Sequence, residues 1–423
     1  MEAPAPTLTR RVFRPDDTPA RIRQKVVVMI LAAAALLAAT SLLMSRAQDQ
    51  ARIIGNEAAP QAATASDLYF ALSDLDAQVA RMVLIDGADS LSGSQIDALG
   101  TYRERSRQVD ADLTRLLATA DEAAVLQLTD DLAIYREWVW QALTAESQLP
   151  PQPPGKLPPA ALGFYTQATN ALHLKLLPAA KALRDASETR LDDAYGQQRL
   201  TEVLGIGLAL LLGGALLALL LAFQVWLVGR FRRVLNPALL AATVVTLGLT
   251  VSACVVFAGS AQRISAARED SLEPFLQLSQ TRAVSYDAAA DTSRYLISGG
   301  LPFYTADFTA KSDGLVAEPA VLERWKAYQR DHERIVALAD SGRTAEAIDT
   351  LTGIRRGDAA FDFSYFDAAI SAVATERKQA FDTSFAEGQD LLTGWVLIPI
   401  AAMSLVIMLV SLSVRRRLAE YRA

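Results

Sequence analysis

Two long apolar runs, separated by a short basic break, constrain this chain more than any other feature. Residues 203–228 and residues 238–258 contain no charged side chain. About 20 apolar residues in a helix cross the roughly 30 Å hydrocarbon core of a bilayer, so each run is long enough to span a membrane. The break at 229–237 holds Arg230, Arg232, Arg233 and Pro237, which cannot remain in hydrocarbon. The sequence therefore predicts a membrane hairpin with a basic tip.

Two further uncharged runs, residues 26–44 and residues 391–414, predict two more spanning helices. The alternative for the run at 26–44 is a cleaved signal peptide. However, this run is longer than the usual apolar core of roughly 7–15 residues, and it follows a long basic leader. We therefore favour an uncleaved helix and predict four membrane spans.

The distribution of charge predicts how these spans are oriented. The leader at 1–25, the tip at 229–237 and the tail at 415–423 each carry a net charge of +3. In contrast, residues 46–200 and residues 259–391 each carry −7, from 14 basic and 21 acidic side chains. Because Lys- and Arg-rich segments stay in the cytoplasm, both termini and the tip are expected inside, in a multi-pass plasma-membrane protein. The domains at 45–202 and 259–390 are then extracytoplasmic.

Composition also limits the partners of these segments. The leader contains four prolines in little apolar context and predicts a disordered basic tail that contacts anionic membrane lipids or a cytoplasmic partner; we favour lipids. Acidic external domains do not predict binding to nucleic acid. Cys254, the one cysteine, lies in the third span, so the external domains are expected to fold without disulfides.

The external segments have the apolar spacing of helices and predict an all-α fold. Apolar residues recur at intervals of three and four, and alternation typical of strands is not evident. Such stripes predict two antiparallel bundles standing on the membrane spans. In the first bundle we expect helices from the first span to Gly87, then at 94–119, 121–148 and 160–200, the last continuing into the second span. In the second we expect a helix to Ser298, shorter ones near 303–312, 319–340 and 343–352, and one from Phe361 into the fourth span.

The two halves of the chain resemble each other. Adding 213 to the residue number lays the first helix of one half on that of the other without a gap. The aligned positions share an Asp, an Arg and a Gly, with fixed spacing between them and the same distance from a span: Asp74 with Asp287, Arg81 with Arg294, and Gly87 with Gly300. Internal duplication is therefore predicted.

The repeated Asp and Arg are the candidate ligand or partner contacts: Asp74 and Arg81 in one half, Asp287 and Arg294 in the other. Seven residues place both side chains on one helix face. One interpretation is that each Arg stands in a pocket and binds a ligand carboxylate through two hydrogen bonds. The other, which we favour, is that each Arg pairs with acidic groups of a neighbouring helix.

Residues that would support catalysis are not evident. His173 and His332 are isolated from each other and from any metal-binding spacing, and phosphate-binding or nucleophile motifs were not found. The four spans hold no charged side chain, which argues against an ion or substrate path. We therefore expect a protein that is not an enzyme and has no catalytic residues, metal or cofactor.

Two rows of small residues predict close helix packing in the second span: Gly205, Ala209 and Gly213, and then Gly214, Ala218 and Ala222. A homodimer is compatible with the sequence. The cytoplasm would meet short basic segments, so the predicted output surface comprises Arg230, Arg232 and Arg233 with Arg415, Arg416 and Arg417.

Several stretches resemble the GlnX family of actinobacterial membrane sensors. They are Leu75-Asp76-Ala77, Tyr102-Arg103-Glu104, residues 160–169, Leu176-Leu177-Pro178-Ala179-Ala180 and the basic ending at 414–422. The resemblance implies a four-span protein that reads an extracytoplasmic solute-binding lipoprotein for aspartate or glutamate. It further implies a relay to a cytoplasmic serine/threonine kinase. The Pro-rich connector at 149–159 departs from the family.

Two other functions are compatible with the sequence. One is a direct small-ligand receptor, since the external helices also resemble the four-helix-bundle domains of chemoreceptors. The other is a structural envelope protein that holds a neighbour without signalling. The residues themselves predict a two-bundle membrane sensor; the choice among these three depends on the resemblance.

Overall fold

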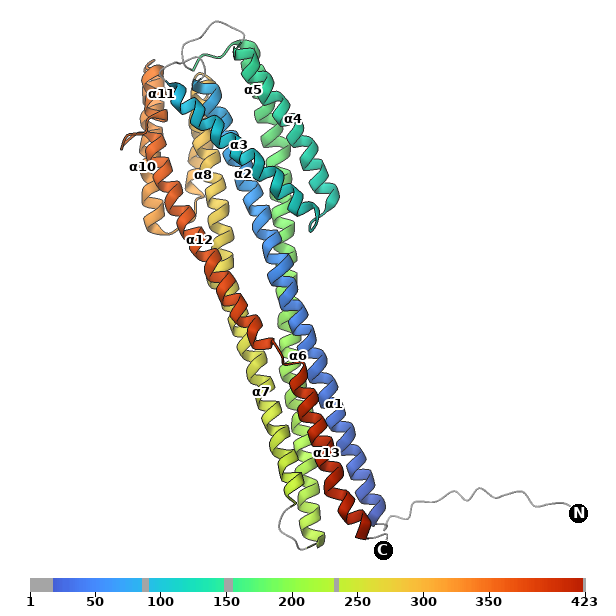
Figure 1. The fold of residues 1–423 in the computed structure, drawn as a ribbon. Coiled ribbons are helices and arrows are strands. Elements are labelled where there is room, and N and C mark those ends of the chain that lie inside the picture. Colours follow the sequence, from blue (N-terminus) through green and yellow to red (C-terminus); the bar gives the residue numbers. More distant parts are fainter. Residues whose placement is uncertain (1–17, 86–90, 148–154, 232–235, 421–423) are drawn as a thin grey trace, which may run out of the picture. The chain divides into compact units, whose positions relative to one another are not determined.

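Helices make up the described structure, as the sequence predicts. The computed structural model describes residues 18–85, 91–147, 155–231 and 236–420, and within these ranges it has no strands (Figure 1). By length and composition, four helical stretches could cross a membrane: Ile22–Ile85, Pro159–Val228, Pro237–Ile297 and Ala359–Ser413. Each contains one predicted span, so the all-α, four-span prediction is confirmed.

The chain divides into two compact units. Unit 1 comprises Met1–Ala51, Gly196–Arg263 and Glu387–Ala423, and unit 2 comprises Arg52–Tyr195 and Ile264–Ala386. Unit 1 holds the predicted spans. Unit 2 contains most of both predicted external domains, so these two segments of the chain share one compact unit.

In unit 1, the described helical residues come from α1 (Thr18–Ile53), α6 (Leu177–Phe231), α7 (Pro237–Ala267), the end of α12 (Ala359–Leu392) and α13 (Leu397–Glu420). Buried apolar side chains of α1, α6, α7 and α13 form a core that includes Leu36, Leu220, Leu239 and Met403. Asn236 begins α7: its side-chain oxygen accepts a hydrogen bond from the backbone N–H of Ala238 at 3.1 Å. Pro237 follows at the first helical position, where its missing N–H costs no helical hydrogen bond.

The two predicted rows of small residues on α6 differ. In the first row, a Cβ added to Gly205 would lie 2.8 Å from the Phe257 ring, and one on Gly213 would lie 2.3 Å from Thr250 Oγ1. These glycines therefore let α6 and α7 approach closely. Gly214, in the second row, has nothing within 4 Å of its added Cβ, and its row is exposed in unit 1.

The expected continuity of the last external helix with the fourth span is wrong. α12 ends at Leu392 and α13 begins at Leu397. Between them Gly394 has φ +81°, a left-handed conformation that glycine adopts without strain and that ends a helix. Pro399 then lies in the first turn of α13, a place that tolerates proline.

Unit 2 is built from helices of both halves of the chain. The first half supplies α2 (Ala59–Ile85), α3 (Ser92–Leu117), α4 (Glu122–Ser147), α5 (Pro159–Ala171) and the start of α6. The second supplies α8 (Glu273–Ile297), α9 (Pro302–Asp313), α10 (Pro319–Asp340), α11 (Thr344–Thr352) and most of α12. Helix α2 packs on α8, its counterpart in the repeat, and also on α3. Both α2 and α8 are therefore buried along most of their length.

Three prolines explain why the long helices are not uniform. Each follows a π-helical segment by two residues, and the pairs are Ile54–Ala58 (η1) with Pro60, Leu172–Leu176 (η3) with Pro178, and Arg268–Leu272 (η4) with Pro274. A proline inside a helix lacks an N–H and clashes with the carbonyl four residues earlier, and a wider turn relieves that clash. The sequence predicts a kink at Pro60. A π-helical segment precedes this proline and also precedes Pro274, so the first helix has a wider turn near its proline in both halves of the repeat.

Candidate functional site

Arg294 of α8 lies at the centre of a buried group of carboxylates. Its side chain is 1% exposed. Its guanidinium donates to Asp291 at 2.5 Å and to Asp287 at 3.0 Å, one turn and two turns earlier on the same helix. It also donates to Asp76 of α2. Arg294 therefore joins the two halves of the repeat by an ion pair with both side chains removed from water.

A second cation and a tyrosine complete this group, which we call the Arg294 cluster: Asp76, Tyr135, Asp287, Asp291, Arg294 and Lys311. Lys311 of α9 contacts Asp287 at 2.8 Å and Asp291 at 2.6 Å. Tyr135 of α4 donates to Asp76 at 3.2 Å. Breaking a buried pair by removing one partner leaves an uncompensated charge, which costs about 3–5 kcal/mol.

The carboxyl groups of the Arg294 cluster have pKa values that are pushed apart. Burial alone would raise the pKa of Asp287. Arg294 and Lys311 have the larger effect, and they hold this pKa well below its usual range. For Asp291, burial prevails over the same cations, and with Asp287 nearby it raises the pKa to about 6. Burial opposes the charge of Arg294, but Asp76, Asp287 and Asp291 hold its pKa above the ordinary value. Burial thus favours the neutral form of Asp291, whereas the two cations favour the ionised form of Asp287.

The corresponding aspartate of the first half, Asp74, has a different partner. Arg105 of α3 donates to one of its oxygens, and Gln78 donates to the other at 2.7 Å. Burial raises the pKa of Asp74 while Arg105 opposes that rise. Asp74 and Asp287 thus each receive a cation from the next helix along the chain, Arg105 from α3 and Lys311 from α9.

Arg81, the counterpart of Arg294, stands in a pocket. It contacts Asp97 of α3 at 3.4 Å, and the two side chains are 23% and 70% exposed. The pocket beside it has a volume of about 340 Å³ and is lined from α2, α3, α8, α10, α11 and α12. Its wall includes Gln78, Tyr286, Ala289 and Phe363.

The structure brings Asp287 and Arg294 together, as the repeated pattern predicts, whereas Asp74 pairs with Arg105 and Arg81 with Asp97. The pattern did not identify Asp76 and Asp291 as partners of Arg294. Position 76 aligns with Ala289 and position 291 with Gln78, so a comparison restricted to identical residues overlooks both. The sequence signal for these two partners is a position that holds an aspartate in one half of the repeat and a different residue in the other half.

The predicted output residues are described only in part. Arg230 lies in the last turn of α6, and Arg415, Arg416 and Arg417 lie in α13. Arg232 and Arg233 are outside the described residues. Their predicted role stays a prediction.

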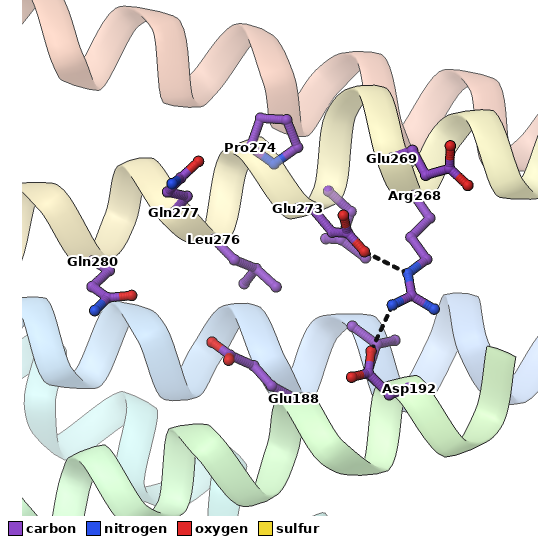
Figure 2. A pocket seen from close by; sticks show the side chains of 11 residues that line it. Glu188, Asp192, Arg268, Glu269, Glu273, Pro274, Leu276, Gln277 and Gln280 are labelled. Carbon is purple, nitrogen blue, oxygen red and sulfur yellow. Dashed lines mark hydrogen bonds and ion pairs between the residues drawn. The ribbon is translucent and has the colours of Figure 1, made fainter. Parts of the chain in front are cut away.

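A second pocket of unit 2 is polar and rich in carboxylates. It has a volume of about 520 Å³ and is lined from α6, η4 and α8. Arg268 donates to Asp192 at 2.8 Å and to Glu273 at 2.7 Å, and Glu188 and Glu269 also line the pocket (Figure 2). The carboxylates of Asp192 and Glu273 are 62% and 52% exposed, although Arg268 is half-buried. Ion pairs with one well-solvated partner contribute about 0–1 kcal/mol. We therefore assign this pocket no part in the candidate site.

The two histidines have different surroundings. His332 stacks on Phe308 with 3.6 Å between ring centroids, and Thr292 Oγ1 lies 2.8 Å from its Nδ1. Burial lowers the pKa of His332 to about 4, so this ring is neutral at pH 7. His173 lies 3.7 Å from Asp287 at the edge of the Arg294 cluster. Across the described ranges, no three His, Cys, Asp or Glu residues are grouped to hold a metal ion.

Comparison with known proteins identifies one part of the chain. Residues 50–196 match the family model of an actinobacterial sensor domain. The match covers α2 to α5 and the beginning of α6, and thus about a third of the chain. No curated protein and no solved structure matches.

Proposed function

We propose that this chain, whose residues 50–196 match the actinobacterial sensor domain, is a transmembrane sensor that reads an external solute-binding lipoprotein. The lipoprotein carries aspartate or glutamate, and the chain passes its state to a cytoplasmic serine/threonine kinase. The sensor role follows from the domain family. The lipoprotein, the amino acids and the kinase follow from the resemblance to GlnX-type sensors and await experiment.

The observation that carries the proposal is the charged contact between α2 and α8. A sensor needs an element with two arrangements whose balance a ligand or partner can shift. An interface of buried ion pairs suits this role, because its partners are discrete and a lost pair costs several kcal/mol. The helices at this interface follow η1 and η4, which in turn follow α1 and α7. A change in the contact of α2 with α8 therefore acts on segments that lead directly to two spans.

The proposed orientation places unit 2 outside the cell and the basic segments in the cytoplasm. It rests on the positive-inside distribution of charge. The cytoplasmic segments are short, so we propose that the kinase reads the relative position of the basic residues around 230 and 415. A catalytic role is not part of the proposal. Reporter fusions at the tip, and near Gly155 and Gly314, test the orientation: cytoplasmic signal is expected at the tip and external signal at the other two.

The decisive experiment captures the full-length chain from solubilised membranes, with and without added glutamate or aspartate. We expect the preparation to contain a solute-binding lipoprotein and a serine/threonine kinase, in amounts that depend on the amino acid. A matched variant carries a flexible Gly-Ser insertion between Arg199 and Glu202, inside α6. Because α6 contains residues of both units, the insertion should keep the lipoprotein but remove the amino-acid dependence of the kinase.

One result would contradict the proposal, and another would narrow the route by which the signal crosses the membrane. Capture that does not change with the amino acid would favour a structural envelope protein. A full response from the insertion variant would exclude transmission along α6.

A further inference from the structure

Arg81 and Arg294 occupy equivalent positions on the two repeat helices, but their surroundings differ in one respect that concerns ligand binding. Arg294 is enclosed by Asp76 from the other half and by Asp287 and Asp291 from its own helix. Arg81 meets Asp97, which is mostly in water, at 3.4 Å. Burial lowers the pKa of Arg81, and Asp97 opposes this shift. Arg81 is thus a partly desolvated cation with weaker compensation among the described residues.

The sequence explains why a pocket lies beside Arg81. Asp76, which reaches across to Arg294, aligns with Ala289 in the other half. Ala289 lines the pocket together with Arg81. The same crossing of α2 and α8 therefore brings a carboxylate to Arg294 and a methyl group to the wall of the Arg81 pocket.

The remainder of the wall suits a small organic molecule. Tyr286 and Phe363 meet edge to face with 4.8 Å between ring centroids, and both line the pocket. Ser293 and Ser364 add hydroxyl groups. A volume of about 340 Å³ falls in the range of roughly 300–1,000 Å³ that is usual for small-molecule sites. Asp97 and Asp367 also line the pocket, and both oxygens of Asp367 accept hydrogen bonds from Arg282, at 2.6 and 2.9 Å. An apolar wall with a few polar groups is the usual composition of a small-molecule site.

A route to the pocket is also present. Arg81 and Asp97 also line a third, wider pocket of about 900 Å³, together with Arg334 and Asp358. The Arg81–Asp97 pair thus stands between the inner pocket and this outer basin. An incoming carboxylate can replace Asp97 on Arg81, and Asp97 can then return to water at little cost because it is exposed.

We propose that the Arg81 pocket binds a small organic carboxylate, with the guanidinium of Arg81 receiving the carboxylate in the way that Arg294 receives Asp76. The site accepts a free carboxylic acid or the α-carboxylate of an amino acid. A ligand there touches α2, α8 and α12 at once, so it would act on the same contact that we propose for signalling. The binding itself does not depend on the proposed lipoprotein or kinase.

The test uses the purified full-length protein in detergent and measures binding by calorimetry and thermal shift. The probes are glutamate, aspartate, phenylalanine and benzoate, with phenylalaninamide and benzamide as matched compounds without a carboxylate. We expect saturable binding of at least one carboxylate and none of its amide. Amino acids that bind while benzoate does not would identify the source as an amino acid, and the reverse would identify a simple acid.

Two variants tie the binding to this pocket. Arg81→Gln should weaken binding at least tenfold, or about 1.4 kcal/mol. Ala289→Asp places a carboxylate where the other half has one, so it should abolish binding and raise the thermal midpoint. Arg268→Gln, in the other pocket, is the control and should bind as the unchanged protein does.

The proposal is overturned if none of the carboxylates binds at millimolar concentration. It is also overturned if binding is unchanged in either Arg81→Gln or Ala289→Asp. Neither result bears on the relay to the kinase, because the binding test is done without either partner.

Discussion

The two halves of unit 2 place the same Asp and Arg on equivalent helices and use them differently. In the second half the Arg is enclosed by three carboxylates, one of them from the first half. In the first half the Asp pairs with Arg105, and the Arg faces a pocket. Two exchanges, Asp76 against Ala289 and Gln78 against Asp291, account for much of this difference. Duplication thus yields one copy that is closed by the protein's own carboxylate and one that is open to a carboxylate from outside.

The largest expected effect separates the two arginines by stability. Arg294→Met should destabilise unit 2 by about 3–5 kcal/mol, because Asp76, Asp287 and Asp291 would remain buried without their main cation. Arg81→Met should cost about 1 kcal/mol or less, because Asp97 is exposed. Denaturant unfolding of the purified protein, followed by circular dichroism, measures both values. Equal losses would mean that the two halves do not differ in the way described.

A double-mutant cycle sharpens the same comparison. Asp76→Asn with Arg294→Met should give a coupling energy of about 2 kcal/mol, since the pair is buried and joins two helices. Asp97→Asn with Arg81→Met should give less than about 1 kcal/mol. A coupling energy near zero for the first pair would show that Asp76 does not hold α2 to α8.

A smaller effect concerns pH and a carboxyl group of α10. Burial and the neighbouring Asp362 raise the pKa of Asp331 from 3.8 to about 7. Below pH 3.8 Asp331 is protonated in the folded and in the unfolded protein. As the pH rises above this value, the carboxyl group ionises first in the unfolded protein, so the free energy of unfolding falls until the pH exceeds about 7. Asp331→Asn should therefore raise the thermal midpoint at pH 8 by roughly 2–4 °C and change it little at pH 4. An equal shift at both pH values would contradict this assignment.

Much of the architecture could be predicted from the sequence because its signals are local. Uncharged runs predicted the four spans, and spacings of three and four residues predicted the helices of unit 2, most of them to within two residues. The break between α12 and α13 was missed, because Gly394 and Pro399 lie in an otherwise apolar run.

The site was harder to predict, because its chemistry depends on contacts between the halves. Asp287 and Arg294 share a helix, so their proximity follows from spacing alone. The contact of Asp76 with Arg294 spans 218 residues and depends on the packing of α2 on α8. The sequence did not show that the segments predicted as two bundles would share one compact unit.

The most direct test of this comparison removes the carboxylate of Asp76 from Arg294, so that a carboxylate added in solution can take its place. Asp76→Ala should remove the carboxylate from Arg294 and lower the thermal midpoint, and added acetate should restore part of that loss. Arg81→Gln is included in both proteins compared, so that acetate at the first pocket does not contribute. We predict that acetate at tens of millimolar raises the midpoint of Asp76→Ala more than that of its Asp76 parent, with acetamide at the same concentration giving no such difference. Equal responses of the two proteins to acetate would contradict the claim that Asp76 holds the place of a ligand carboxylate.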